Sequence, residues 1–151
     1  MSLKKYQAKR KFAKTPEPKG KKTKKSLSRF VIHKHQASHL HWDLRLELDG
    51  VLKSWAVPKE PPIELGIKRL AVQVEDHPVD YINFEGIIPP GNYGAGPVEI
   101  WDKGKFTLLK RTLKEITVFF SGRRLKGQYM LIKPKGSRFG QKAWLFFKIK
   151  N

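Results

Sequence analysis

The chain has 151 residues, no cysteine, and 32 Lys or Arg against 13 acidic residues, which gives a net charge of +19 at pH 7. Its length fits one domain with a hydrophobic core, and the lack of cysteine excludes disulfides and thiolate chemistry. So large a positive charge favours an acidic partner, with nucleic acid first and an anionic membrane second. No apolar run reaches the roughly 18 residues of a membrane span, and no signal peptide is evident. We therefore expect no membrane partner and a soluble, cytoplasmic, nucleoid-associated protein.

The charge is concentrated near the N-terminus. Residues 1–28 hold eleven Lys or Arg and one acid, Glu17, and so carry +10. The run from Lys19 to Lys25 (KGKKTKK) has no apolar residue to bury, so we predict a basic, largely flexible leader over 1–28 and a folded domain over 29–151. The leader could be a solubilising tail, but because the domain is basic too, we favour a nucleic-acid role.

From Arg29 onward the pattern is typical of β-structure. The segment 41–48 (HWDLRLEL) alternates strictly, so its polar and apolar residues point to opposite faces. Asp49-Gly50 predicts a hairpin turn. In 69–75 the pattern indicates that Leu70, Val72 and Val74 point inward. We predict strands before residue 36, over 41–48, 51–57 and 69–75, and near 97–101, 105–109, 116–121, 128–133 and 144–149, with room for a helical turn within 108–115.

Eight or more short strands separated by turn residues predict an all-β fold, a compact, closed or nearly closed antiparallel β-barrel. One face of its strands forms the apolar core, and the other face is free for chemistry. The histidines are concentrated on this second face, and four of the five lie within nine residues.

His41 and Asp43 lie two apart on one strand and therefore share a face, and His35 ends the preceding strand, where it can meet them across the turn. Two imidazoles and a carboxylate suit Mn²⁺, Zn²⁺ or Fe²⁺ and leave positions open for water or substrate. Arg45 lies one step further along this face, and its fixed fork of donors suits a phosphate. The alternative interpretation is a solvated polar face that is rich in histidine.

Long segments of the chain resemble a known family. The segments KHQASHLHWDLRLELDGVLKSWAVPK, VEDHPVDYINFEGIIPPGNYGAGPVEIWDKG, GRRLKGQYMLIK and WLFFKIK are similar to the 3′-phosphoesterase domain of bacterial ligase D and its stand-alone archaeal homologues. The resemblance implies a compact β-barrel with a divalent metal, Mn²⁺ first and Zn²⁺ or Co²⁺ as alternatives. It also implies repair of 3′ ends, in which a terminal ribonucleoside is removed and a 3′-phosphate is hydrolysed to a 3′-hydroxyl.

The resemblance also implies roles for particular residues. The family's metal ligands fall on His35, His41 and Asp43, and its catalytic and phosphate-binding groups fall on Arg45, His77 and Tyr81. Further substrate contacts match Lys59, Arg69, Arg10 and Glu17. Position 33 is commonly glutamine in the family, so we expect His33 to support a ligand rather than to bind the metal. At position 11 the family has aspartate where this chain has lysine, and we expect Lys11 to make nucleoside removal slower or absent.

Other interpretations remain open for several of these residues. His77 could be a turn residue before Pro78, Tyr81 a core aromatic of the next strand, and Lys59 mere surface charge. His39 is expected at the surface, and Glu75 and Asp76 as turn or supporting residues. The glycine-rich segment 88–96 lacks the Walker lysine, so we interpret it as a structural loop, with Tyr93 near the substrate.

Two rival functions use the same fold. A non-catalytic nucleic-acid-binding barrel would keep the positive charge, but would have no reason to keep His35, His41 and Asp43 together. A metal-dependent enzyme of small molecules would not need +19. The expected substrates are DNA or RNA-containing 3′ ends of a primer-template. The expected partners are a separate ATP-dependent ligase, a polymerase or a Ku-type end-binding protein, because the chain is too short to hold these functions itself.

Overall fold

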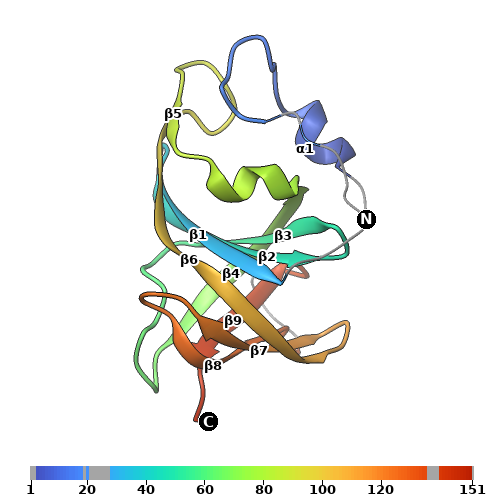
Figure 1. The fold of residues 1–151 in the computed structure, drawn as a ribbon, viewed down its shortest axis with the longest axis vertical. Helices are drawn as coiled ribbons and strands as arrows, with labels where there is room; N and C mark the ends of the chain where they lie inside the picture. Colours follow the sequence, from blue (N-terminus) through green and yellow to red (C-terminus); the bar gives the residue numbers. More distant parts are fainter. Residues whose placement is uncertain (1–2, 19, 21–27, 136–139, 151) are drawn as a thin grey trace.

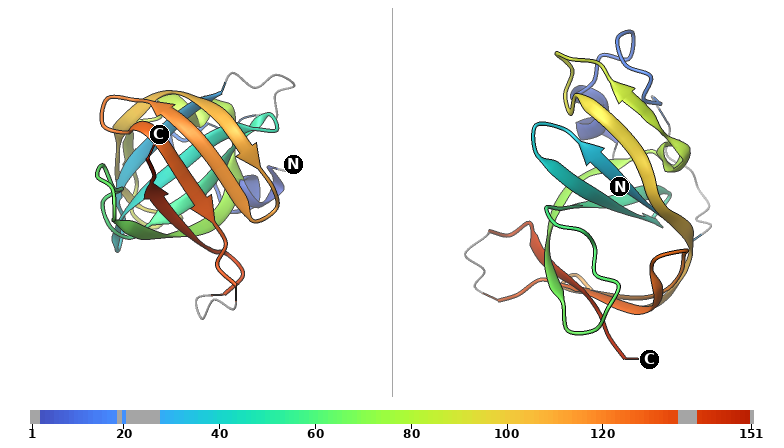
Figure 2. Two further views of the ribbon diagram at one scale, coloured as in Figure 1. Left: turned by 90° about the horizontal axis from the view of Figure 1, so that it is seen from below. Right: turned by 90° about the vertical axis from the view of Figure 1, so that its left-hand side faces the viewer.

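The computed structural model describes residues 3–18, 20, 28–135 and 140–150. Its strands pair in the order β1-β2-β3-β4-β9-β8-β7-β6-β5, and a further β1–β6 pairing closes the first eight into an antiparallel barrel, with β5 outside the ring (Figures 1 and 2). The predicted closed barrel is therefore confirmed. The strands are β1 (Arg29–Gln36), β2 (Leu40–Leu48), β3 (Val51–Val57), β4 (Lys68–His77), β5 (Gly86–Ile88), β6 (Gly96–Arg111), β7 (Glu115–Ser121), β8 (Lys126–Ile132) and β9 (Ala143–Lys148).

The barrel interior holds the main hydrophobic core. On β2 the apolar residues of the alternating pattern, from Trp42 to Leu48, all belong to this core, as predicted. They share this core with aromatic side chains of other strands, including Phe30 of the neighbouring β1, Phe120 of β7 and Phe146 of β9. The polar residues of β2 point to the outer face of the barrel wall, because successive side chains of a strand alternate.

The Asp49-Gly50 hairpin joins β2 to β3 as predicted. Both residues have positive φ, 57° and 76°, which is the turn geometry that suits two twisted antiparallel strands. The turn sets the register, so Arg45 lies opposite Ser54 on the outer face. The helical turn allowed within 108–115 is absent from the structure, since β6 continues to Arg111 and a tight turn leads into β7.

The predicted inner face of β4 is wrong. Ala71 is fully buried in the barrel core, opposite Trp144, whereas Leu70, Val72 and Val74 are only half-buried. A small side chain is needed inside because the indole of Trp144 fills that part of the interior. β4 also carries one extra residue against β3, since Leu52 pairs with His77 and Ser54 with Val74. This bulge turns His77 to the outer face.

A second, smaller core lies on the outer face of the barrel wall. It joins Tyr6 of helix α1 (Lys4–Ala8), Tyr81 and Ile82 of the 3₁₀ helix η1 (Val79–Asn83), and apolar residues of β1, β3, β5 and β6. Figure 1 shows α1, η1 and β5 gathered at one end of the barrel. None of the helices in the described part of the chain has the length and apolar character that a membrane crossing requires.

Residues 3–18 of the leader pack against this second core, which differs from the expectation of a largely flexible segment over 1–28. The physical reason is that Tyr6 is fully buried and Phe12 packs beside it, so the leader has apolar groups to bury. The basic run around Lys19–Lys25 lies outside the described residues, apart from Gly20. The domain boundary at residue 28 stays a prediction.

Candidate metal centre and phosphate site

Three potential metal ligands converge on the outer face of the β1–β2 hairpin. His35 and His41 lie directly opposite each other across the two strands, and Asp43 follows two residues along β2. One potential ligand atom from each residue lies within 4.8 Å of the others. Asp43 Oδ2 is 3.6 Å from His35 Nδ1 and 3.3 Å from His41 Nε2. The structure thus brings together the trio expected from the sequence.

Backbone carbonyls hold the far side of both imidazole rings. His35 Nε2 donates to the carbonyl of Gly94 at 2.6 Å, and His41 Nδ1 donates to the carbonyl of His39 at 3.0 Å. In the neutral rings, the remaining nitrogens therefore carry lone pairs that face the same carboxylate oxygen. A cation shared by these atoms would remove the electrostatic repulsion among their lone pairs. An imidazole whose second nitrogen donates to a carbonyl is also the usual arrangement of a metal-binding histidine. The donor set fits a divalent metal.

Asp43 stays ionised despite its burial. Burial alone would raise its pKa, but the charge of Arg45, and the hydrogen bonds that His35 and His41 donate when the nitrogen facing Asp43 carries a proton, hold the pKa of its carboxyl well below the usual range. Arg45 Nη2 lies 3.4 Å from Asp43 Oδ2. The same carboxylate raises the pKa of His41 in the metal-free protein, against the opposing effect of burial. The centre therefore presents a fixed negative charge at the meeting point of the two rings.

Arg45 is itself held by neighbours on the outer face. Its Nε donates to His33 Nδ1 at 3.2 Å and its Nη1 donates to Ser54 Oγ at 2.9 Å, while its guanidinium lies 5.0 Å from the centre of the Tyr81 ring. Burial and the charge of Arg45 lower the pKa of His33 to about 3, so His33 is a neutral acceptor. The structure places His33 beside Arg45 rather than among the ligand atoms.

His77 lies across the cavity from the metal trio. Its Nδ1 donates to the carbonyl of Glu75 at 3.0 Å, which leaves Nε2 as the acceptor for Arg10 at 3.3 Å. Burial, together with the charges of Arg45 and Arg10, lowers the pKa of His77 well below its usual value. The ring is therefore neutral in this structure, and the lone pair of its Nε2 atom points at Arg10.

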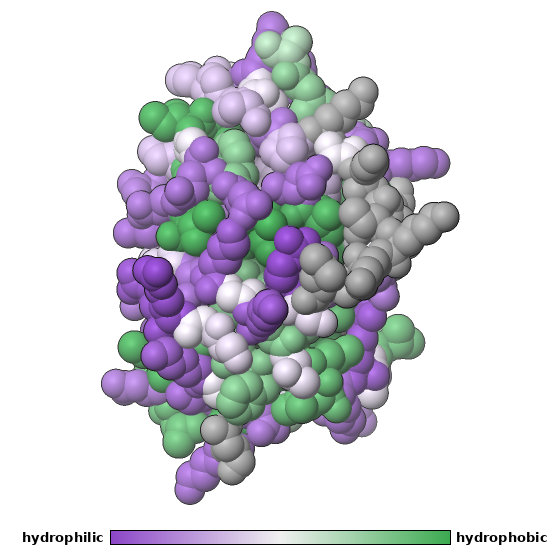
Figure 3. All heavy atoms as spheres, in the orientation of Figure 1, coloured by the Kyte–Doolittle hydropathy of each residue, from purple (hydrophilic) through white to green (hydrophobic). Residues whose placement is uncertain are grey.

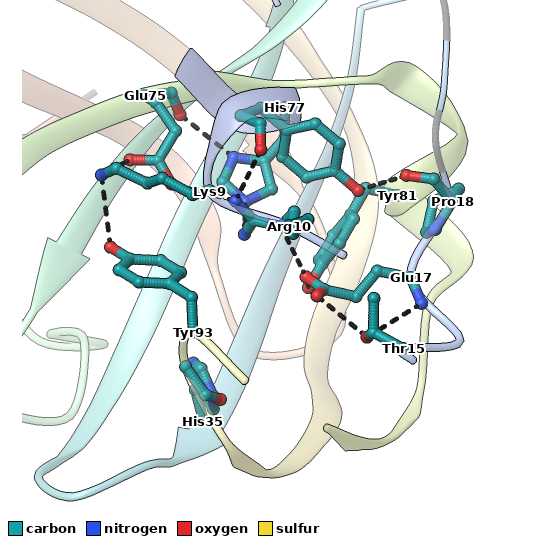
Figure 4. A network of polar contacts seen from close by, with 12 residues as sticks. Lys9, Arg10, Thr15, Glu17, Pro18, His35, Glu75, His77, Tyr81 and Tyr93 are labelled. Atoms are coloured by element: carbon teal, nitrogen blue, oxygen red, sulfur yellow. Dashed lines mark hydrogen bonds and ion pairs between the residues drawn. The ribbon is translucent and has the colours of Figure 1, made fainter. Parts of the chain in front are cut away.

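The leader is tied into the site by a buried network (Figure 4). Arg10 Nε pairs with Glu17 at 3.0 Å, and Tyr81 donates its hydroxyl to the same carboxylate at 2.7 Å. Tyr6 stacks near Arg10, with the guanidinium 4.1 Å from its ring centre. Burial, followed by the neighbouring Glu17, raises the pKa of Tyr81 well above its usual value, so it remains a hydroxyl donor. Tyr81 is thus neither a strand residue nor only a core aromatic.

These groups line one cavity of about 330 Å³. It includes Arg10, Arg45, His77, Tyr81 and the metal trio, together with Glu75, Tyr93 and Gly94 from its rim. Glu17 reaches the cavity through its contacts with Arg10 and Tyr81.

Other residues considered from the sequence lie elsewhere. Lys59 is exposed and Arg69 donates to the carbonyl of Glu60, and neither is among the cavity residues. Lys11 and His39 are exposed, as expected for His39. Asp76 pairs with Lys53 at 3.3 Å.

Several contributors were missed by sequence reasoning. Ser54 could have been found, because the Asp49-Gly50 turn already places it opposite Arg45. The carbonyl of Gly94 could not have been found, because every residue type has a backbone carbonyl and the sequence does not indicate which one accepts a hydrogen bond from His35. Lys9 binds Glu75 at 2.9 Å and also reaches Tyr93, but nothing in the leader's periodicity predicts where it docks.

Comparison with known proteins identifies the family. Residues 33–133 match the family model described as the DNA ligase D 3′-phosphoesterase domain. The chain is 49% identical, over 99% of its length, to the multifunctional non-homologous end joining protein LigD of Pseudomonas aeruginosa. It is 43% identical to the LigD proteins of Mycobacterium tuberculosis and Mycolicibacterium smegmatis, over 99% and 97% of its length. It covers 19% to 20% of these relatives, about a fifth of their length. The chain belongs to the ligase D 3′-phosphoesterase domain family.

Proposed function

We propose that the chain is a divalent-metal-dependent 3′-phosphoesterase of nucleic-acid repair, which converts 3′-phosphate ends to 3′-hydroxyl ends. The observation that carries the proposal is the convergence of His35, His41 and Asp43 with both rings fixed by carbonyls, on the wall of a cavity that also holds Arg10, Arg45 and His77. Family membership supports the phosphoesterase chemistry, and the net charge of +19 supports a nucleic-acid substrate.

His35, His41 and Asp43 are the residues that would hold the metal. A bound divalent ion would offset the charge of a phosphate oxygen and lower the pKa of a bound water. Mn²⁺ is our first choice, and Zn²⁺ or Co²⁺ also suit this mixed nitrogen and oxygen donor set.

The protein's own groups bind and orient the phosphate. Arg45 and Arg10 supply two guanidinium groups, which match phosphate oxygens as fixed forks of donors. Both are anchored, Arg45 by His33 and Ser54 and Arg10 by Glu17, so little conformational entropy is lost when the phosphate binds. The neutral His77 accepts a hydrogen bond from Arg10 through its Nε2, and its lowered pKa makes it a weak base. Its role in the proposal is therefore to orient Arg10 toward the phosphate.

Removal of a terminal ribonucleoside is the second reaction that we propose for this site. The 2′-hydroxyl of the penultimate ribose is its natural nucleophile, because it lies beside the scissile phosphate. Lys11 follows Arg10 directly but is exposed and outside the cavity residues. We expect nucleoside removal to be slower than 3′-phosphate removal, as the lysine at this position suggested.

We further propose a place for the chain in non-homologous end joining. The relatives that it matches are named as multifunctional end-joining proteins, and this chain covers about a fifth of them. A 3′-hydroxyl is what a ligase or a polymerase requires, so a separate ATP-dependent ligase, polymerase or Ku-type end-binding protein would act beside it.

The test uses a 5′-labelled primer-template that ends in a 3′-phosphate. The wild type with Mn²⁺ should convert it to a 3′-hydroxyl. His41→Ala should lose this activity and bind Mn²⁺ more weakly, while retaining affinity for the DNA. Tight DNA binding without turnover in the metal-loaded wild type would instead support a non-catalytic nucleic-acid-binding barrel.

A further inference from the structure

Tyr93 is an open aromatic ring at the rim of the candidate site. Of the two tyrosines that line the cavity, Tyr81 is 2% exposed and hydrogen-bonded, whereas Tyr93 is 51% exposed. Figure 4 shows Tyr93 between Lys9 and His35. Lys9 and Arg10 lie over the ring, at 4.8 and 5.4 Å from its centre, and the exposed half of the side chain is the surface that planar groups of a substrate can cover.

The loop that carries Tyr93 is pressed against β1 on its C-terminal side. A Cβ atom at Gly94 would lie 3.2 Å from His35 Cε1, and one at Gly96 would lie 2.1 Å from the carbonyl oxygen of Gln36. Both glycines have positive φ, so side chains are excluded there by conformation as well as by space. The ring of Tyr93 is therefore held at a set position next to the metal trio.

Lys9 fixes the ring from the leader side. Its ammonium group donates to the Tyr93 hydroxyl at 3.4 Å, lies 4.8 Å from the ring centre and is anchored by Glu75 at 2.9 Å. Because Lys9 and Arg10 are adjacent, the same turn of the leader that faces His77 also positions Tyr93. A ring held from two sides loses little freedom when a base stacks on it.

We propose that Tyr93 is the stacking platform for the base of the terminal nucleoside, and so distinguishes a nucleoside end from a 3′-phosphate end. This inference rests on the proposed function. If the scissile phosphate of a diester substrate is bound between Arg45 and His77, the terminal base lies toward the exposed edge of the cavity. Tyr93 is the exposed one of the two tyrosines that line this cavity. A 3′-phosphate end has no base beyond the phosphate and gains nothing from the ring.

The experiment measures affinity rather than turnover. Three primer-templates are compared by fluorescence anisotropy with the Mn²⁺-loaded full chain. One ends in a nucleoside, one ends in an abasic sugar at the same position, and one ends in a 3′-phosphate. The penultimate sugar is 2′-deoxy in all three, which removes the nucleophile for nucleoside removal. For the 3′-phosphate end, a phosphorothioate is used to slow hydrolysis, and binding is read at early times.

The expected result is specific to the base. Stacking of one base on an aromatic side chain is worth about 5- to 150-fold in affinity, so the wild type should bind the nucleoside end that much more tightly than the abasic end. Tyr93→Ala should lose this preference and Tyr93→Phe should keep it. Phe119→Ala, at an exposed aromatic residue of β7, is the matched control and should change nothing.

Results of two kinds would overturn the proposal. One is a wild type that does not distinguish nucleoside from abasic ends, or a Tyr93→Ala variant that still does. The other is an equal loss of affinity for all three ends in Tyr93→Ala, because that pattern means that the residue only supports Gly94 and His35. Since the comparison needs no turnover, it remains decisive even if the 3′-phosphoesterase activity proposed above is absent.

Discussion

At the scale of single residues, Arg45 joins the two halves of the site. Its guanidinium pairs with the carboxylate of Asp43 and donates hydrogen bonds to His33 and Ser54. It also lines the cavity. The sequence indicated a phosphate contact alone, because the spacing of Arg45 from Asp43 shows a shared face but not a shared hydrogen-bond network. In the structure Arg45 also stabilises the ionised carboxylate that would bind the metal.

We predict that Arg45→Ala lowers both turnover and metal affinity. Removal of a group that orients a metal-binding carboxylate typically costs 10- to 100-fold in affinity or activity. Calorimetric titration with Mn²⁺ measures the first effect and 3′-phosphate release the second. Ser54→Ala is the matched control, since it removes one partner of Arg45 and leaves the contact with Asp43 in place. Unchanged Mn²⁺ affinity in Arg45→Ala would restrict the arginine to the substrate.

His77 gives a pH-dependent prediction with a definite sign. Its pKa is lowered in the folded protein, so between that value and the ordinary 6.5 only the unfolded chain takes up the proton. Its contribution to folding stability is therefore complete above about pH 6.5 and is lost as the pH falls below it, by up to about 1.4 kcal/mol per pH unit. Urea unfolding in the presence of a chelator, at pH values from 5 to 7.5, should show a shallower fall for His77→Gln than for the wild type. Identical slopes would mean that His77 takes up protons equally in the folded and unfolded chain, so that its pKa is not lowered by folding.

At the scale of elements, the leader and the barrel have separate cores. Among the residues that the structure describes, none of the leader belongs to the barrel core, whereas Tyr6 belongs to the outer core with Tyr81 and Ile82. The two parts can therefore respond differently to mutation, and local opening of the leader need not unfold the barrel.

We predict that Tyr6→Ala undocks the leader while the barrel stays folded. The variant removes the fully buried ring against which His77, Tyr81 and Arg10 pack. Tryptic cleavage after Arg10 should become faster, and the thermal unfolding of the barrel should change little. Tyr6→Phe, which keeps the ring but loses the hydrogen bond to the Pro18 carbonyl, should stay closer to the wild type. Cooperative loss of the whole fold in Tyr6→Ala would show that the two cores are one unit.

The strands show which parts of the fold sequence reasoning can reach. The alternation of 41–48 and the Asp49-Gly50 turn are local signals, and they predicted the faces of β2 and its hairpin with β3. The short turn after His35 likewise predicted that His35 meets His41 across the two strands. The prediction for β4 was wrong because the residues that face inward are decided by partners distant in the sequence. Ala71 lies inside the barrel opposite Trp144 of β9. A bulge before His77 then reverses which residues of β4 face inward and which face outward. The docking of α1 was equally out of reach, since five residues carry no helical periodicity.

At the scale of the whole molecule, the net charge of +19 is the dominant property. Figure 3 shows hydrophilic residues over much of one face, with hydrophobic groups between them. Eleven of the basic residues lie within 1–28. The described part of this leader places Arg10 in the cavity, whereas the lysines at 19, 21, 22, 24 and 25 lie outside the described residues.

Deletion of residues 19–25 should weaken DNA binding and reduce its dependence on salt. The segment holds five lysines, and each phosphate that a protein neutralises contributes about 0.9 to the slope of log affinity against log salt. The slope should therefore fall by up to about 4.5 units in a titration from 50 to 300 mM salt. A variant with the same residues replaced by a neutral linker of equal length controls for the position of the leader. An unchanged slope would identify the run as a solubilising tail.

The most direct test of the account is the metal dependence of one reaction. The protein is freed of metal with a chelator, dialysed, and assayed for conversion of a primer 3′-phosphate to a 3′-hydroxyl across a titration with Mn²⁺. The account predicts no conversion without metal, a saturable rise with Mn²⁺, and no rise for Asp43→Ala, which removes the carboxylate at the centre of the trio. Conversion by the metal-free wild type, or an undiminished response of Asp43→Ala to Mn²⁺, would contradict it.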